Sequence, residues 1–324
     1  MVDWQIRGTF TSLAVALILG STACAHPTSS SYAYAELSSN GLTRAAEGQI
    51  KPGKRFEMGS IAKYACTIAT LRLIDRGKLA LDDNIGSVLP ELDGRDIGLV
   101  TVQRLLENRS GLADGLMPAL REDMTAVAAV ETTTEAIRAY VPPGLEFEPG
   151  SRFSYDLVNW IVVQALVERV YGGTLKEALT ELVLDPAGLE TVMVLDRAAD
   201  PNLQPPVTPA TRAPLFLQCA GGLAGMPSDL IRLQQFVHGG GLSPSSLAAI
   251  QTIATPDEDY ALGGRFRTVD GRLLDWKTGS NGPYKSLSIY DPERKIGFAA
   301  MTAQNDWAAI EQARDEWLER TKNN

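Results

Sequence analysis

Histidine and cysteine are scarce in this chain of 324 residues, which contains two histidines and three cysteines. A zinc site of the usual His/Cys kind therefore has almost no ligands available, and a Ser-His-Asp triad has one realistic histidine. The sequence also has no Gly-x-Ser-x-Gly nucleophile elbow, which argues against a standard α/β-hydrolase. Any catalysis must come mostly from serine, lysine, tyrosine, aspartate and glutamate.

Long apolar runs and an excess of basic charge are also missing. No apolar run reaches the roughly 18–20 residues that a bilayer span needs, which excludes a polytopic membrane protein. Thirty Lys and Arg stand against 39 Asp and Glu, giving a net charge of −9 without any basic cluster. This charge balance argues against nucleic acid as a partner. With 44% hydrophobic and 21% charged residues, the composition is that of a globular protein.

The N-terminus is typical of an export signal. Residues 10–20 form an apolar stretch of signal-sequence length, and small residues flank Cys24. We expect residues 1–25 to be a signal peptide, which places the protein in the periplasm or on a membrane. Cleavage after small residues and acylation of Cys24 as a lipoprotein anchor both remain open. Only Cys66 and Cys219 remain for certain in the mature chain, and we expect two free, buried thiols.

Strand patterns occur at both ends of the chain around a helical middle. The expected strands are residues 32–37, 42–49, 272–279, 285–290 and 295–302. The expected helices are residues 60–75, 102–108, 124–138, 157–170, 175–184, 228–236 and 307–320. We therefore predict an α+β fold in one domain, residues 26–324. One antiparallel sheet from both termini (about 32–59 and 258–324) would carry an inserted all-helical lobe (about 60–257).

The first chemical motif is Ser60-Ile61-Ala62-Lys63, at the start of an apolar helix. Residues three apart share one helix face, so the Ser60 hydroxyl and the Lys63 amine can come within hydrogen-bond reach. Burial and the positive end of the helix dipole both disfavour the charged amine and lower its pKa. Lys63 then becomes a base toward Ser60. The alternative is a chance match, with a lysine that has a structural partner only.

Two further motifs lie later in the chain. Tyr155 sits where a Pro-Gly loop turns into a helix, and a core aromatic residue is the alternative explanation for it. Lys277-Thr278-Gly279-Ser280 ends a predicted strand, and an exposed edge lysine before a turn is the alternative there.

In this order, the motifs resemble those of the serine β-lactamase and D,D-peptidase clan, in its class C-like branch, which also contains esterases. The resemblance covers most of the mature chain and predicts a β-lactamase/transpeptidase-like fold. The matching segments are residues 56–63, 105–112 (Leu-Leu-Glu-Asn-Arg-Ser-Gly-Leu), 149–155, 220–223 and 277–279.

The resemblance implies a role for each matching residue. Ser60 would be the acylated nucleophile, with Lys63 and Tyr155 sharing proton transfer. The backbone N–H groups of Ser60 and Ser280 would form the oxyanion hole. The segment from Lys277 through Thr278 and Gly279 would hold a substrate carboxylate, or its lysine would polarise Tyr155. No metal or organic cofactor is implied.

The match departs from the family at one position. The family often has Tyr-x-Asn where this chain has Tyr155-Asp156-Leu157, and leucine cannot contact a substrate amide. This disfavours β-lactam turnover, whereas Lys277 favours a substrate that bears a carboxylate. Asn159 could supply the missing polar group, although a capped or solvated asparagine is the simpler explanation. We expect His238, after a helix, to be a surface C-cap residue.

The leading hypothesis is an exported serine hydrolase with a Ser60 acyl-enzyme, acting on an ester, a D-amino-acid peptide or a β-lactam. Its partner would be a small-molecule or peptide substrate, and nothing in the sequence predicts an oligomeric state. The alternative is a penicillin-binding sensor or pseudoenzyme of the same fold that acylates without turnover, which Leu157 motivates.

Overall fold

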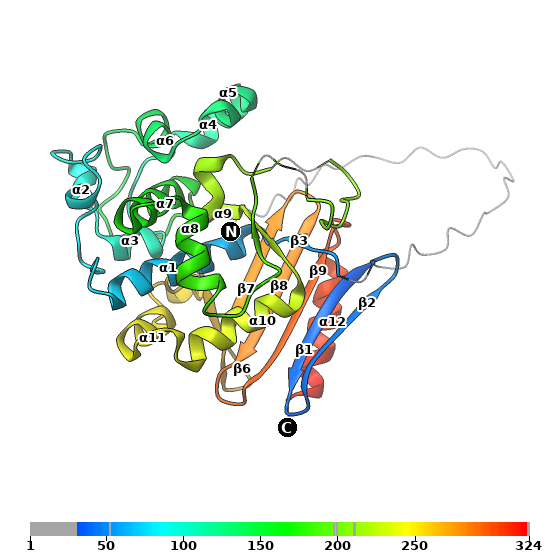
Figure 1. The fold of residues 1–324 in the computed structure, drawn as a ribbon. Helices are drawn as coiled ribbons and strands as arrows, with labels where there is room; N and C mark the ends of the chain where they lie inside the picture. The colour runs from blue at the N-terminus through cyan, green and yellow to red at the C-terminus, as the bar shows by residue number, and fades with distance from the viewer. Residues whose placement is uncertain (1–30, 52, 197, 199, 210–211, 323–324) are drawn as a thin grey trace, which may run out of the picture.

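A six-stranded antiparallel sheet forms one side of the molecule in the computed structural model (Figure 1). The model describes residues 31–51, 53–196, 198, 200–209 and 212–322. The strand order is β2-β1-β9-β8-β7-β6. Its strands are β1 (Tyr32–Ser38), β2 (Gly41–Glu47), β6 (Arg265–Val269), β7 (Arg272–Asn281), β8 (Tyr284–Asp291) and β9 (Ile296–Thr302). The expected signal peptide, residues 1–25 with Cys24, lies outside the described residues.

The sheet joins the two ends of the chain, as expected. Strand β1 pairs with β9 in antiparallel register, with Ala35 opposite Ala299. Side chains alternate between the two sheet faces, so each face has its own apolar cover. Helix α12 (Trp307–Arg320) covers one face, where Trp317 packs on Phe298. Helix α10 (Pro227–Phe236) contacts β1, β8 and β9 and covers the other face (Figure 1).

The helical part lies between these strands in the sequence and packs around α1 (Ala62–Asp75) and α7 (Leu157–Tyr171). Both helices are apolar on nearly all sides, because other helices surround them. The remaining helices are α2 (Ile85–Val88), α3 (Val102–Leu106), α4 (Leu116–Glu122), α5 (Met124–Ala129), α6 (Thr133–Tyr140), α8 (Leu175–Leu179), α9 (Gln218–Gly221) and α11 (Pro244–Gln251).

The predicted helix over residues 124–138 is two helices, α5 and α6. The break has a local cause: Thr132 and Glu135 form a capping box that starts α6. The cap satisfies backbone N–H groups that a continuous helix would have bonded internally. Hydrophobic spacing extends across this boundary, so periodicity alone could not detect it.

A second, three-stranded sheet lies beside the large sheet, where β3 contacts β8. It has the order β3-β5-β4 and consists of β3 (Phe56–Glu57), β4 (Met193–Val194) and β5 (Leu223–Gly225). Strand β3 leads directly into the 3₁₀ turn η1 (Gly59–Ile61) and then into α1. In the described part of the chain, no helix has the length and apolar character needed to cross a bilayer.

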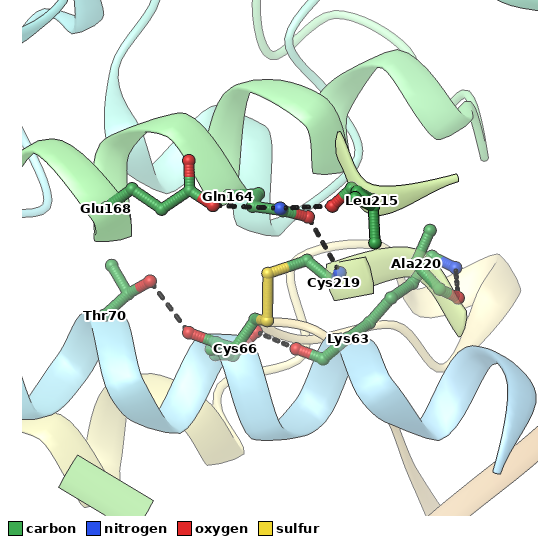
Figure 2. Close-up of a disulfide and its surroundings, with 9 residues drawn as sticks. Lys63, Cys66, Thr70, Gln164, Glu168, Leu215, Cys219 and Ala220 are labelled. Carbon is green, nitrogen blue, oxygen red and sulfur yellow. Dashed lines mark hydrogen bonds between the residues drawn. A yellow bond between two sulfur atoms is a disulfide. The ribbon is translucent and has the colours of Figure 1, made fainter. Parts of the chain in front are cut away.

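The expectation of two free thiols is wrong. Cys66 on α1 and Cys219 on α9 form a disulfide, 153 residues apart in sequence (Figure 2). Both residues are fully buried, as expected. The pairing depends on α9 crossing against α1 and α7, which is a tertiary contact without a local sequence signal.

Candidate active site

Ser60 is in turn η1, where the helical part meets the end of β7. Two glycines permit this close approach. Gly59 has a φ of +53°, and a Cβ on it would lie 2.5 Å from the Ser280 backbone nitrogen. A Cβ on Gly279 would collide with the Met58 carbonyl oxygen. Because neither glycine has a side chain, the Ser280 N–H lies beside the turn that carries Ser60.

The Lys63 amine lies one helical turn from Ser60 and is fully enclosed, with a residue exposure of 1%. Its Nζ atom donates to Ser60 Oγ at 3.3 Å and to the Ala220 carbonyl oxygen at 2.9 Å. Burial lowers the pKa of Lys63, and interaction with Tyr155 partly opposes this shift. A neutral amine at this position can accept the Ser60 proton.

Tyr155 lies next to the Lys63 amine, in the loop before α7. The Lys63 Nζ atom is 5.0 Å from the centre of the Tyr155 ring, which is 42% exposed toward the cleft. Its loop is held by Asn108, whose carbonyl accepts from the Ser154 N–H at 2.8 Å. The Asn108 side chain also accepts from Trp160 at 3.1 Å. The residue 105–112 motif therefore positions the loop that carries Tyr155.

Ser60 and Tyr155 line a cleft of about 430 Å³. It is lined by Ser60, Phe153, Tyr155, Glu258, Arg265, Thr278, Gly279, Ser280 and Trp307. The structure thus brings together the predicted nucleophile, the tyrosine and three residues of the β7 motif. Their catalytic and binding roles stay predictions.

Lys277 does not line the cleft, unlike the three residues that follow it on β7. Its side chain is 3% exposed, and its Nζ atom is 2.5 Å from Asp275 Oδ1. The same amine donates to the Arg265 carbonyl at 2.9 Å and lies 4.3 Å from the ring centres of Tyr64 and Phe266. Lys277 is absent from the cleft lining but lines a small recess of about 20 Å³ that also includes Ser60 and Tyr155. Residues two apart on a strand share a face, so the Asp-x-Lys spacing was a sequence signal for this pair.

Asp275 is the centre of a buried polar cluster. Tyr64 donates to it at 2.7 Å, and His238 Nε2 lies 3.0 Å from the same carboxylate. Burial raises the pKa of Asp275, but the charge of Lys277 and the contact with His238 outweigh it and hold the pKa below its ordinary value. The expectation of a surface C-cap for His238 is wrong: its side chain is 4% exposed and stacks on Tyr290.

Neither Leu157 nor Asn159 supplies a polar group to the cleft. Leu157 is the first residue of α7 and is absent from the cleft lining. Asn159 is buried, and its side chain accepts from Ser110 at 2.5 Å and donates to the Asp156 carbonyl at 3.4 Å. It is therefore neither solvated nor a replacement for the family asparagine.

Sequence reasoning missed three cleft residues, namely Glu258, Arg265 and Trp307, and gave no site role to Phe153 within the matching segment 149–155. Arg265 is a cation that faces the cleft and lies 3.3 Å from Glu258 Oε2. Its guanidinium also stacks 5.5 Å from the Tyr260 ring centre. Arg265 begins β6 and Trp307 begins α12, so only the tertiary fold brings them beside Ser60.

Comparison with solved structures shows the fold. A penicillin-binding protein from Bacillus halodurans matches with a TM-score of 0.76 and 20% identity, covering 88% of this chain and 95% of that one. A D-stereospecific amidohydrolase from Streptomyces sp. matches with a TM-score of 0.74 and 20% identity, covering 85% and 89%. The expected β-lactamase/transpeptidase-like fold class is confirmed.

Sequence relatives include a penicillin-binding protein and an esterase. Penicillin-binding protein 4 of Amycolatopsis lactamdurans is 28% identical over 51% of this chain and 42% of its own length. Esterase EstB of Burkholderia gladioli is 33% identical over 41% of this chain and 37% of its own length. The chain thus matches less than half the length of these relatives. The family model described as Beta-lactamase matches residues 29–321, and this chain therefore belongs to the beta-lactamase family.

Proposed function

We propose that this protein is a serine hydrolase that forms an acyl-enzyme on Ser60 and acts on esters. The observation that carries the proposal is the enclosed Lys63 amine, 3.3 Å from a Ser60 hydroxyl that faces the cleft. Burial lowers the pKa of Lys63, which favours the neutral amine that can act as a base, and the adjacent Ser60 hydroxyl is its proton donor.

The proposed reaction has two steps. Ser60 Oγ attacks the ester carbonyl while its proton moves to Lys63, and the backbone N–H groups of Ser60 and Ser280 receive the developing oxyanion. The C–O bond to the alcohol breaks, and the alcohol leaves with the proton returned through Lys63 and Tyr155. Water then attacks the acyl carbonyl, and one of its protons passes to the same groups. The bond between the acyl carbon and Ser60 Oγ breaks, Ser60 Oγ receives that proton, and the acid is released.

Three features favour esters over D-peptides and β-lactams. Lys277, the family cation for a substrate carboxylate, is committed to Asp275 and to the Arg265 carbonyl. Leu157 removes the side-chain amide that would meet a substrate amide. Arg265, the cation that faces the cleft, is already paired with Glu258. An ester without a carboxylate needs neither an unpaired cation nor a side-chain amide in the cleft for binding.

The first test is intact mass after incubation with a fluorophosphonate probe. We expect one adduct on the wild type and none on Ser60→Ala or Lys63→Ala, whereas the exposed control Ser245→Ala retains it. No adduct on folded wild type would overturn the proposal. Steady turnover of p-nitrophenyl butyrate should then exceed turnover of a chromogenic cephalosporin and of a D-Ala-D-Ala peptide. Acylation that stops at one equivalent would instead support the sensor alternative.

We also propose that the protein is exported. The Cys66–Cys219 disulfide supports this, because such bonds persist mainly in oxidising compartments. Fractionation of cells that express the full chain should place it in the periplasmic or membrane fraction, and Cys24→Ala should release it if Cys24 is acylated. Full-length protein confined to the cytoplasm would contradict export.

A further inference from the structure

The two cysteines of the disulfide lie close in sequence to Lys63 and to the Ala220 carbonyl, which accepts a hydrogen bond from the Lys63 amine. Cys66 follows Lys63 by one helical turn on α1, and Cys219 immediately precedes Ala220 on α9. Figure 2 shows the sulfur bridge between these two helices, with the Lys63 side chain extending along α9 toward Ala220. The covalent link therefore joins the helix of the amine to the helix of its acceptor.

The Ala220 carbonyl is the shorter of the two hydrogen-bond contacts of Lys63. Nζ lies 2.9 Å from the Ala220 oxygen and 3.3 Å from Ser60 Oγ. Tyr155 is the titratable group that faces the amine, and the ring of Trp160 lies 5.6 Å away. A lysine has four rotatable side-chain bonds, so an acceptor fixed in space is what keeps its amine directed at the serine.

Helix α9 has little ability to hold this acceptor by itself. It spans four residues, Gln218–Gly221, and Gly222 follows it. Gln164 on α7 supplies one restraint, because its Oε1 accepts from the Cys219 N–H at 3.2 Å while its Nε2 donates to the Leu215 carbonyl at 2.8 Å. The disulfide supplies the second restraint, from α1 (Figure 2).

We propose that Cys66–Cys219 is a positioning bond for the proposed base: it holds the Ala220 carbonyl against Lys63, so that the amine stays aligned with Ser60. Cys66 and Cys219 touch neither substrate nor reacting atoms and act through α9 and Lys63. This inference rests on the proposed function of Ser60 and Lys63. It gives the disulfide a role in the rate of acylation beyond its contribution to stability.

The positioning role has a kinetic signature. A carbonyl acceptor stabilises the charged amine, so a displaced Ala220 lowers the pKa of Lys63. The acid limb of the pH–rate profile then moves to lower pH. The plateau rate falls, because the neutral amine is no longer held toward Ser60 Oγ. A purely structural disulfide would change neither feature in the fraction of protein that is folded.

The experiment compares wild type with Cys66→Ala/Cys219→Ala, using p-nitrophenyl butyrate from pH 5 to 10. This range lies below the ordinary lysine pKa of about 10.4, where an acid limb set by a lowered lysine pKa is observed. Variants are preferable to a reductant because both sulfurs are buried. We expect the plateau kcat to fall about tenfold or more, with KM changed less than about threefold. The matched control is Ile310→Ala, in the apolar cluster under α12, which lowers stability without contact to α9.

The outcomes separate the two proposals. Wild type without Ser60 acylation would refute the proposed function itself. Wild type that acylates, beside a double variant with unchanged plateau kcat and pH profile, would overturn the positioning role alone. An equal loss of kcat in Ile310→Ala, at matched melting temperature, would also overturn it.

If the double variant fails to fold, Gln164→Met tests the same inference with the disulfide intact. This change removes the hydrogen bonds by which Gln164 restrains α9 and keeps the side-chain volume. We expect the same direction of change in plateau kcat and acid limb. An unchanged profile in folded Gln164→Met would contradict the proposal that α9 positions Lys63.

Discussion

Replacement of Gly59 by alanine tests how closely the helical part and β7 must approach to form the site. The new Cβ would lie 2.5 Å from the Ser280 backbone nitrogen and 2.7 Å from the carbonyl carbon of the same residue. Backbone atoms cannot rotate away as a flexible side chain can, so η1 and β7 must separate. The separation moves the Ser280 N–H away from the substrate carbonyl oxygen.

Gly59→Ala is expected to have two effects, a loss of stability and a loss of kcat. Alanine at a φ of +53° costs about 1–2 kcal/mol relative to glycine, wherever it occurs. Loss of one oxyanion-hole donor lowers kcat by about 10²–10³-fold. Gly77 provides the matched control at the other end of α1: its φ is +66°, and a Cβ there meets nothing within 4 Å. Gly77→Ala should therefore lose similar backbone stability and retain activity.

The assay is the rate of Ser60 acylation by p-nitrophenyl butyrate, with thermal melts of both variants. We expect a decrease in melting temperature of about 2–4 °C for each kcal/mol in both proteins. Only Gly59→Ala should lose acylation. If Gly59→Ala acylated within about threefold of Gly77→Ala, the Ser280 N–H would not be the oxyanion donor that we infer.

The remaining predictions concern Lys63, Lys277 and Asp275. Acylation should rise with pH through the lowered pKa of Lys63 and level off above it, and Lys63→Met should remove this dependence with about 10²–10⁴-fold loss of rate. Lys277→Met should keep ester acylation within about tenfold, because Lys277 is committed to Asp275, and a loss as large as that of Lys63→Met would refute this. Asp275→Asn should cost about 3–5 kcal/mol in urea melts by leaving a buried cation unpaired, whereas Asp315→Asn in an exposed pair should cost less than about 1 kcal/mol. Because the pKa of Asp275 is lower in the folded than in the unfolded state, its contribution to stability is present above pH 4 or so and disappears as pH falls through the folded pKa.

Local sequence patterns were sufficient for the nucleophile helix and for five of the six strands of the large sheet. Neither β6 nor the small sheet of β3, β4 and β5 was predicted. Ser60 and Lys63 are three residues apart where the 3₁₀ turn η1 continues into α1, and this local helical geometry brings their side chains together. The strands around Lys277 and Ala299 follow from alternation and turn residues, which are also local. Each matching family segment is also a contiguous stretch of sequence, so the segments and their order could be recognised without the structure.

Tertiary structure decided which of these residues face the cleft and which do not. The sequence places Lys277 and Thr278 side by side, but strand alternation sends one toward Asp275 and the other toward the cleft. The Cys66–Cys219 disulfide and the arrival of Arg265 beside Ser60 join segments more than 150 residues apart. The way in which helices and strands pack against one another decides which side chains are buried and which charges pair. Because that packing joins distant segments, the local sequence does not determine it.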